Sequence, residues 1–368
     1  MSDTPTTEQG TARVLLDATG LGTLDAFADE YVIELARAAG KANDNLVVVC
    51  RPRDAKLFKS FNLEVHRAPD RIRSERSRRF WLTWSLPRFA KQLGVHVIHS
   101  PHDAFPAGGS IRRVVAVHHP VGRPVRPAYR TATALRLDVV APSETVATDL
   151  RDATTAPANR VHVAHRGIDK NQARIPNWDV LSTVSEGYGF TEWITVVASD
   201  ESVDALAAFC AGYRQATEFS DFRPSIVVTG IDEGIALRHI GDLIDAGFDV
   251  RVVGSIVGEE RSALLGGALF SVVLDDSSRT GRSLLEAMMC GATVLTTTAP
   301  TFVECGGSAV AFAEPSAAAM EIAITELIKQ PERRQSLATS AVTHANLFTW
   351  DACLDAHRAA WSRARARA

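Results

Sequence analysis

The segment with the clearest chemical meaning is a polar loop, Asp275–Ser283, followed by an apolar run, Leu284–Cys290. The loop reads DDSSRTGRS, and the run LLEAMMC is predicted to be a helix that Gly291 ends. The start of a helix presents unpaired backbone N–H groups and the positive end of the helix dipole. With Arg279 and Arg282 beside it, this start is suited to binding a phosphate. The alternative is an ordinary capped helix start with exposed arginines.

Apolar runs of strand length alternate with helical segments along the chain. In the first half, strands are expected at 13–18, 45–50, 64–67, 95–99, 113–118, 139–142 and 161–164, with helices at 26–39, 80–93 and 144–153. In the second half, strands are expected at 194–198, 225–229, 249–253, 269–274 and 292–296. Such alternation predicts parallel sheets with crossover helices, and hence two doubly wound, Rossmann-like α/β domains.

The polar stretch 169–187, which contains Pro176 and Gly187, marks the expected domain boundary. We therefore expect an N-terminal domain over 1–176, a C-terminal domain over 177–345 and a terminal helical segment over 346–368. Ligands of doubly wound sheets bind beyond the carboxyl ends of the strands. A ligand site in a cleft between the two facing domains is therefore expected.

Composition narrows the class of protein. The chain has 368 residues, of which 46% are hydrophobic, so it is long enough for two globular cores. No apolar run reaches the roughly 18 residues that span a bilayer, and the polar, acidic start predicts no signal peptide. The five cysteines are odd in number and lack metal-ligand spacing, which predicts reduced core thiols in a cytoplasmic protein.

Charge is divided unevenly along the chain. Residues 1–176 hold 26 Lys and Arg against 18 Asp and Glu, a net +8, whereas residues 177–368 hold 14 against 25, a net −11. A basic first half favours an anionic partner there, such as a phosphorylated acceptor or an anionic lipid, and the alternative is ordinary surface charge. No RNA-binding motif accompanies it, so nucleic acid is not an expected partner.

In the basic segment Arg71–Lys91, the aromatic residues Phe80, Trp81 and Trp84 are interleaved with the charges. It could lie on an anionic membrane surface as a peripheral contact. The favoured interpretation is a loop followed by an amphipathic helix whose aromatic face packs in the core.

Several segments together resemble the GT-B glycosyltransferases, family 4 in particular. They are DATGLG at 17–22, SPHDAFP at 100–106, VVAVHHP at 114–120, APSETVATDL at 141–150, HVAHRGID at 162–169, LLEAMMCG at 284–291 and the tail from Phe348. The resemblance implies two Rossmann-like domains facing a cleft, with the terminal helix crossing back to the first. It also implies transfer of a sugar from a nucleoside diphosphate donor to a glycan, lipid-linked or small-molecule acceptor, with retention and with no metal or cofactor.

The resemblance also assigns residues. It places His118 as the catalytic residue that faces the sugar and the acceptor, and Glu286 on the ribose. The remaining donor-binding positions are loop residues near the phosphates, namely Gly20, Gly22, Ser199, Ser202, Ser278, Gly281 and Arg282.

The chain departs from the family at its donor-binding cations. In the family, an Arg and a Lys bind the diphosphate of the donor. In this chain, Ala198 or Ser199 stands at the position of the Arg, and Ser202 or Val203 at the position of the Lys. Ser278 also replaces the first Glu of the family's Glu-x7-Glu pair. These losses support a second hypothesis, a catalytically silent GT-B protein that serves as partner or scaffold of an active enzyme or as a glycan-binding module.

Overall fold

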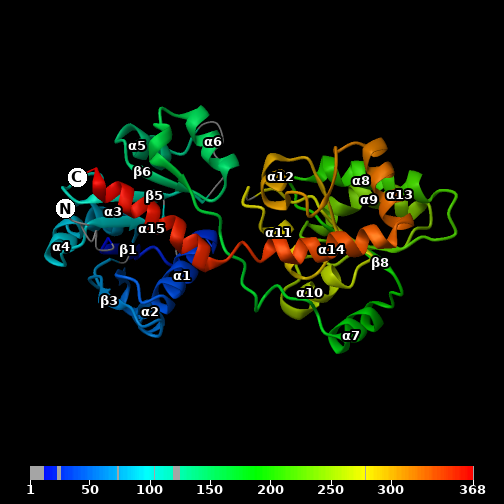
Figure 1. Ribbon diagram of the computed structural model, residues 1–368, viewed down its shortest axis with the longest axis horizontal. Helices are drawn as coiled ribbons and strands as arrows, with labels where there is room; N and C mark the ends of the chain where they lie inside the picture. The colour runs from blue at the N-terminus through cyan, green and yellow to red at the C-terminus, as the bar shows by residue number, and fades with distance from the viewer. Residues whose placement is uncertain are drawn as a thin grey trace, which may run out of the picture. The chain divides into compact units, whose positions relative to one another are not determined.

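The structure is a computed structural model, and it describes residues 12–22, 26–72, 74–102, 104–118, 125–277 and 279–367. The chain divides into two compact units (Figure 1). Unit 1 comprises Met1–Arg166 together with Trp350–Ala368, and unit 2 comprises Gly167–Thr349. Each unit is built on its own sheet, which confirms the expected α/β fold class.

Unit 1 contains a seven-stranded sheet in the order β3-β2-β1-β4-β5-β6-β7. The strands are β1 Val14–Ala18, β2 Leu46–Cys50, β3 Glu64–Arg67, β4 Val97–Ser100, β5 Arg112–Ala116, β6 Asp138–Ala141 and β7 Val161–Val163. Each pairing is parallel, with Val14 opposite Leu46 on one side and Val97 on the other. All seven strands were expected from the sequence to within two residues at each end.

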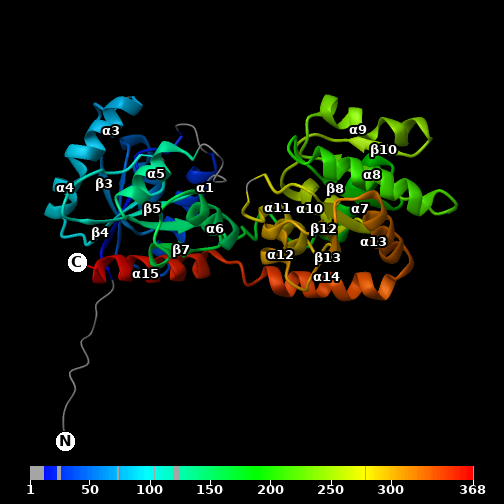
Figure 2. The same ribbon diagram turned by 90° about the horizontal axis from the view of Figure 1, so that it is seen from above.

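Helices cover both faces of this sheet (Figure 2). One face packs against α1 Ala26–Lys41, α2 Ala55–Lys59 and α15 Trp350–Ala366. The other packs against α3 Glu75–Trp84, α4 Leu86–Gln92, α5 Pro127–Ala134 and α6 Glu144–Ala153. Alternate residues of β1 point to opposite faces, with Leu16 in the first core and Leu15 in the second. The central strands are therefore mostly apolar, as is typical of parallel strands buried on both faces, and the buried polar exceptions in β1 and β4 are Asp17, His99 and Ser100.

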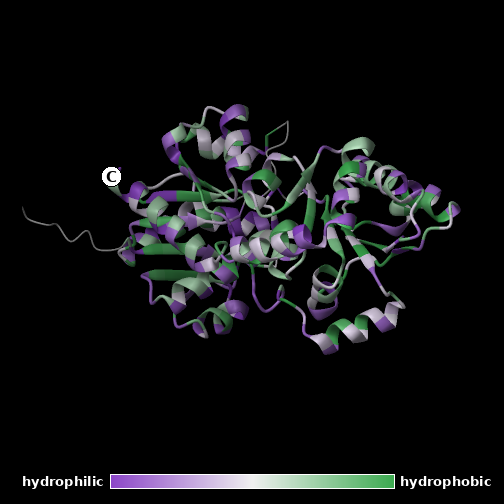
Figure 3. Ribbon diagram, turned by 45° about the vertical axis from the view of Figure 1, so that its right-hand side comes forward, coloured by the Kyte–Doolittle hydropathy of each residue, from purple (hydrophilic) through white to green (hydrophobic). Residues whose placement is uncertain are grey.

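Unit 2 contains a six-stranded parallel sheet in the order β10-β9-β8-β11-β12-β13. The strands are β8 Trp193–Val197, β9 Ser225–Thr229, β10 Val250–Val252, β11 Phe270–Val273, β12 Val294–Thr297 and β13 Ala311–Ala313. One face packs against α8 Val203–Thr217, α9 Glu233–Asp245 and α13 Ala317–Lys329. The opposite side carries α7 Trp178–Tyr188, α10 Gly258–Gly266, α11 Arg282–Met289, α12 Pro300–Gly306 and α14 Pro331–Ala345. In Figure 3 these helices carry hydrophobic and hydrophilic residues side by side, as amphipathic helices on a sheet do.

Three sequence expectations need amendment. The single helix expected over 80–93 is two helices, α3 and α4, because Pro87 at the start of α4 has no N–H to continue the hydrogen-bond ladder. Strand β13 was not expected. In α3 only Trp81 of the three aromatic residues is buried, whereas Phe80 is 67% and Trp84 55% exposed. The prediction that the aromatic face is core was therefore wrong for two of the three.

Residues 167–176, expected in the first domain, pack on unit 2. Ile168 and Ala173 lie in the core beneath α11, and the Gln172 carbonyl accepts a hydrogen bond from Ser262 of α10. The division between the units therefore falls at 166–167, ten residues before the expected 176–177. At the other end of the chain, α15 belongs to unit 1 and packs along α1.

A buried chain of hydrogen bonds joins α15 to the sheet of unit 1. The Tyr31 hydroxyl lies 2.7 Å from Nε2 of His99 and 2.5 Å from Nε2 of His357. The His357 Nδ1 lies 2.7 Å from the Cys353 carbonyl, so Nδ1 carries the hydrogen and Nε2 accepts from Tyr31. The tyrosine oxygen then accepts from His99 Nε2–H, whose Nδ1 accepts from the Trp361 indole at 3.3 Å. Both imidazoles are satisfied in their neutral forms.

All five cysteines are free and buried. Burial raises the thiol pKa to about 12 for Cys50, Cys210, Cys305 and Cys353, and raises that of Cys290 as well. Because the thiolate is the reactive form, we expect none of the five to react with a water-soluble aromatic disulfide at pH 8 in the native protein. All five should react in denaturant. A fast-reacting thiol in the native state would contradict this burial.

Within the described residues, no helix is both long and apolar enough to cross a bilayer.

Candidate functional site

In unit 1 the predicted residues gather at one edge of the sheet. Strands β1, β4 and β5 are neighbours and parallel, so the segments that follow their carboxyl ends meet at the same edge. These segments carry Gly20 and Gly22 after β1, His102 after β4 and His118 after β5. The sheet topology therefore assembles a histidine-bearing edge from three distant parts of the sequence.

A buried ion pair shapes the start of the loop after β1. The Asp17 carboxylate accepts hydrogen bonds from the backbone N–H and the hydroxyl of Thr19, and it pairs with Arg78 of α3 at 3.0 Å. The Arg78 Nε–H also donates to the Thr19 hydroxyl oxygen at 3.0 Å. Asp17 is fully buried and Arg78 is 2% exposed. This pairing fixes the direction in which the chain leaves β1.

Gly20 and Gly22 are held by two residues that the sequence analysis did not select. The Gly22 N–H donates to Oδ2 of Asp29 in α1 at 2.7 Å, and Gly22 has a left-handed φ of 70°. A Cβ on Gly20 would lie only 2.8 Å from the His102 ring, so the loop passes directly over that imidazole. His102 Nε2 lies 3.5 Å from Asp29 Oδ1. The glycines therefore allow close approach of backbone to an aspartate–histidine pair.

His118 lies two residues past β5 and is 5% exposed. Its Nδ1 is 2.6 Å from a terminal nitrogen of Arg166, and its ring stands edge-on to Tyr31 with centroids 4.7 Å apart. A guanidinium can only donate, so Nδ1 accepts and the ring hydrogen is on Nε2. The guanidinium also lies over the Tyr31 ring, 5.7 Å from its centroid. Arg166 thus sets the tautomer of His118, a role with no signal in the sequence because the two residues are 48 positions apart.

In unit 2 the loop after β11 is organised by Asp275. One carboxylate oxygen accepts from the backbone N–H and hydroxyl of Ser277, and the other accepts from the Ser283 hydroxyl at 3.0 Å. Asp275 closes the loop on itself, which brings the chain into the start of α11.

Gly281 is the residue at the start of α11. Its φ of 69° is left-handed, and a Cβ there would lie 2.4 Å from the sulfur of Cys305. Any other residue would meet both backbone strain and a collision. Arg279, two residues earlier, also has a positive φ of 49°. The loop is therefore a tight, specific turn onto the helix.

Glu286 is held between two arginines. Its Oε2 accepts from Nε and a terminal nitrogen of Arg261 in α10 at 3.1 and 3.0 Å, and its Oε1 accepts from Arg282 at 2.7 Å. The Glu286 side chain is 14% exposed, while those of Arg261 and Arg282 are 18% and 33% exposed. The structure thus brings the predicted residues Glu286 and Arg282 together as a pair one helical turn apart. Arg261, which completes the cluster, was not predicted.

Ser199 and Ser202, which stand where the family has its Arg and Lys, form hydrogen bonds with each other across one turn. The Ser199 N–H donates to Oγ of Ser202 at 2.8 Å, and that hydroxyl donates back to the Ser199 carbonyl at 3.0 Å. The adjacent Asp200 accepts from the Asp232 N–H at 3.2 Å. No cation takes the place of the family's Arg and Lys in this turn. Ser278, the remaining predicted position, lies outside the described residues.

The model of Glycosyltransferase Family 4 matches residues 28–172 of the chain. Solved structures of similar fold include a glycosyltransferase from Rickettsia africae, at 13% identity and a TM-score of 0.70, covering 96% of this chain and 98% of that one. HepE from Anabaena, solved with UDP and glucose, is 14% identical with a TM-score of 0.65, covering 96% and 100%. Sucrose-phosphate synthase from Thermosynechococcus elongatus is 16% identical with a TM-score of 0.65, covering 97% and 100%. No curated protein sequence matches the chain.

These comparisons confirm two predictions. The resemblance to glycosyltransferase family 4 is confirmed over residues 28–172, which lie mostly in unit 1. The two-domain GT-B fold is confirmed over nearly the whole chain.

Proposed function

We propose that the protein is a glycosyltransferase that takes a sugar from a nucleoside diphosphate donor and transfers it with retention. The observation that carries this proposal is the family match over residues 28–172, within a chain whose full length has the GT-B fold. Unit 2 is proposed to hold the donor, and unit 1 the acceptor. No metal or cofactor is part of the proposal.

The start of α11 supports the placement of the donor. The loop turns at the left-handed Gly281 into the first turn of α11. The backbone N–H groups of that turn and the positive end of the helix dipole are therefore directed to the space in front of the helix. The cluster of Arg261, Glu286 and Arg282 adds two positive charges against one negative. This net positive charge would stabilise a bound diphosphate. Stabilisation of the departing diphosphate is the main contribution to catalysis that such a transfer requires.

In unit 1, His118 is proposed to act as a hydrogen-bond donor to the sugar or the acceptor. Its Nδ1 accepts from Arg166, which places the ring hydrogen on Nε2, and Nε2–H is the group proposed to donate to a substrate hydroxyl. A neutral imidazole fixed in this way donates to a hydroxyl and orients it; it does not accept a proton at Nδ1.

The first test is thermal stability in the presence of nucleotides. HepE was solved with UDP and with UDP-glucose, so UDP is the first nucleotide to titrate. A ligand that binds only the folded protein raises the melting temperature as its concentration rises above Kd. Inorganic diphosphate is the control for charge alone. Absence of any saturable shift with UDP, GDP or ADP would contradict the donor assignment.

Replacing Glu286 with alanine is expected to weaken UDP binding by about 10- to 100-fold, that is, about 1.5–3 kcal/mol. The carboxylate holds two arginines in position and is proposed to accept the ribose hydroxyls. Glu260→Ala, which removes an exposed carboxylate bonded to Tyr188, is the matched control and should leave binding unchanged. Calorimetry checks both. Equal affinity of the Glu286 variant and the control would rule out the ribose role.

Replacing Arg282 with alanine is expected to abolish transfer, because Arg282 is the arginine nearest the helix start. A chelator should leave activity intact, since no metal takes part. Arg238→Ala, on the exposed face of α9, is the control. Turnover is measured as release of UDP from UDP-glucose with a panel of acceptors. Activity that survives the Arg282 substitution but is lost with chelator would point to a metal instead.

One observation favours the second function, a silent GT-B partner or glycan-binding module. Ser199 and Ser202 bond each other where the family has cations, and Arg282 is paired with Glu286. The variant Ser202→Lys with Ser278→Glu restores two of the lost groups. Should the wild type bind no nucleotide at millimolar concentration while this variant binds it well, the silent-partner function is the right one.

Helix α3 supports a peripheral membrane contact as part of the proposal. Phe80 and Trp84 are exposed one turn apart, with Arg76 and Arg79 beside them. Aromatic rings between arginines suit the boundary of an anionic membrane. Co-sedimentation with phosphatidylglycerol vesicles tests it, with Phe80→Ser and Trp84→Ser as the variants. The cytoplasmic location expected from the cysteines stays a prediction.

A further inference from the structure

Unit 1 contains a cavity of about 420 Å³, and of its described residues Gly20, Gly22 and His118 do not line it. Its walls come from α3, from the segment after β4 and from the start of α5. The lining residues are Arg79, Thr83, Ala104, Phe105, Ala107, Arg126, Pro127, Ala128 and Thr131. A volume of this size fits a small-molecule site. The lining residues Ala104, Phe105 and Ala107 belong to the segment that follows the carboxyl end of β4, as His102 does.

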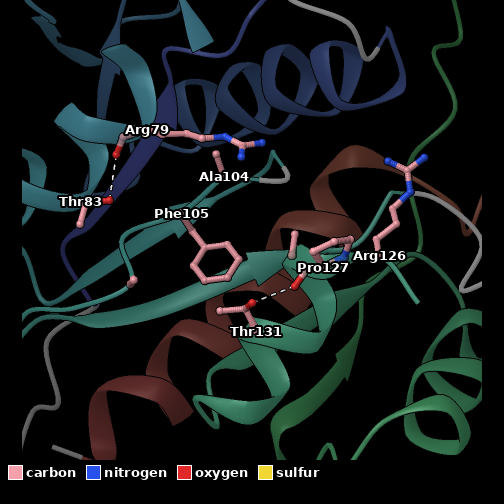
Figure 4. Close-up of a pocket in the computed structure, with 9 residues that line it drawn as sticks. Arg79, Thr83, Ala104, Phe105, Arg126, Pro127 and Thr131 are labelled. Atoms are coloured by element: carbon pink, nitrogen blue, oxygen red, sulfur yellow. Dashed lines mark hydrogen bonds between the residues drawn. The ribbon is translucent and has the colours of Figure 1, made fainter. Parts of the chain in front are cut away.

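The lining is apolar on one part and cationic on another. Figure 4 shows the Phe105 ring between Thr83 of α3 and Pro127 and Thr131 of α5, with Arg79 and Arg126 at the periphery. The hydroxyls of Thr83 and Thr131 each donate to a carbonyl of their own helix, so each presents only oxygen lone pairs. The apolar part can take a hydrocarbon or the face of a sugar ring.

Among the described residues of the lining, both ionisable groups are arginines and none is a carboxylate. Arg79 pairs with Glu75 at 3.2 Å, but the two side chains are 66% and 43% exposed. An exposed pair of this kind is weak, so an anion in the cavity can compete for Arg79 while Glu75 keeps its contact with Arg78. Arg126 immediately precedes α5, whose first N–H groups and positive dipole end therefore belong to the same wall. A planar guanidinium on each side suits the oxygens of a phosphate or carboxylate.

We infer that this cavity binds the acceptor through an anionic group, a phosphate or carboxylate, carried on an apolar body that packs against Phe105. The inference rests on the proposed function in that the ligand is the acceptor of the transfer. The binding itself can be measured without any transfer. Arg79 and Arg126 would then select acceptors that carry an anionic group. The net positive charge of the first half of the chain would attract such acceptors to this unit.

The experiment uses the full chain and three probes in calorimetry. They are glycerol 1-phosphate, dihexanoylphosphatidylglycerol below its micelle-forming concentration, and dihexanoylphosphatidylcholine, which has the same acyl chains and no net charge. The variants are Arg79→Ala, Arg126→Ala and the cavity-filling Ala128→Phe. Arg130→Ala is the control, because Arg130 is exposed on α5 and does not line the cavity. Melting temperatures confirm that each variant is folded.

At least one anionic probe is expected to bind tenfold or more tightly than phosphatidylcholine. Each arginine variant and Ala128→Phe should lose about tenfold or more in affinity, and Arg130→Ala should match the wild type. Binding of glycerol phosphate as tight as that of phosphatidylglycerol indicates a free phosphate-bearing acceptor, and binding of the lipid alone indicates a lipid-borne one. Equal binding of all three probes, or equal affinity of the cavity variants and Arg130→Ala, overturns the inference. Nucleotide binding is measured separately, so its failure would overturn the donor proposal and leave the cavity result standing.

Discussion

Replacing Asp17 with alanine is expected to destabilise unit 1 by about 3 kcal/mol, because the buried Arg78 would lose its buried partner and, among the described carboxylates, keep only the exposed Glu75, 3.3 Å away. Asp17 is fully buried, Arg78 is 2% exposed, and the pair is joined at 3.0 Å. The loss should appear as faster hydrogen exchange in the amides of β1 and β4 of the full chain. The loop that carries Gly20 and Gly22 should lose protection first, since Asp17 also holds Thr19.

Two controls separate a buried pair from an ordinary one. Glu64→Ala breaks the exposed pair with Arg13, also short at 2.6 Å, and should cost about 1 kcal/mol or less. The double variant Asp17→Leu with Arg78→Met should be less destabilised than Asp17→Ala, because replacing both charges leaves none unpaired. If Asp17→Ala and Glu64→Ala lower the free energy of unfolding by the same amount, burial does not determine how much the Asp17–Arg78 pair stabilises unit 1.

The stability of unit 1 is expected to fall as the pH is lowered from about 6.5 to about 4. Burial lowers the pKa of His357 to about 4 and that of His99 well below its usual value. At about pH 7.5 and above both rings are neutral in the folded and unfolded chains, so stability is at its full value. Below it the unfolded chain binds protons that the folded chain does not, so unfolding becomes easier. For His357 the total loss is about 3 kcal/mol, complete near pH 4.

His357→Gln isolates this effect from the carboxylates that also titrate at low pH. A glutamine can accept from Tyr31 and donate to the Cys353 carbonyl as the neutral imidazole does, but it does not titrate. Stability is measured by hydrogen exchange in β4 and α15 at pH 7.0, 6.0 and 5.0. The wild type should lose more protection over this range than the variant. Parallel losses in both would show that the buried imidazoles do not set the pH dependence.

Much of the fold was determined by the sequence alone. Of the thirteen strands in the described residues, twelve were predicted, most of them because buried parallel strands are continuous apolar runs that stand out between polar turns. β13, reading AFA, is only three residues long and gives too little periodicity to detect. Pro87 indicates the break between α3 and α4. The aromatic residues before it favoured a single continuous helix instead. The alternation of strands and helices predicted two α/β domains, and the family resemblance identified them as the two domains of the GT-B fold.

The predicted site residues lie at the carboxyl edges of their sheets, but their partners were set by tertiary structure. Arg166 on His118, Arg261 on Glu286 and His102 beneath Gly20 come from positions distant in sequence, and a crossover topology brings them together. No spacing rule encodes such contacts, because side-chain neighbours across a parallel sheet are separated by whole helices. The sequence alone could thus name the edge of the sheet and the residues along it. Only the packed structure decided the tautomer of His118, the pairing of Arg282 and which of the aromatic residues in α3 are exposed.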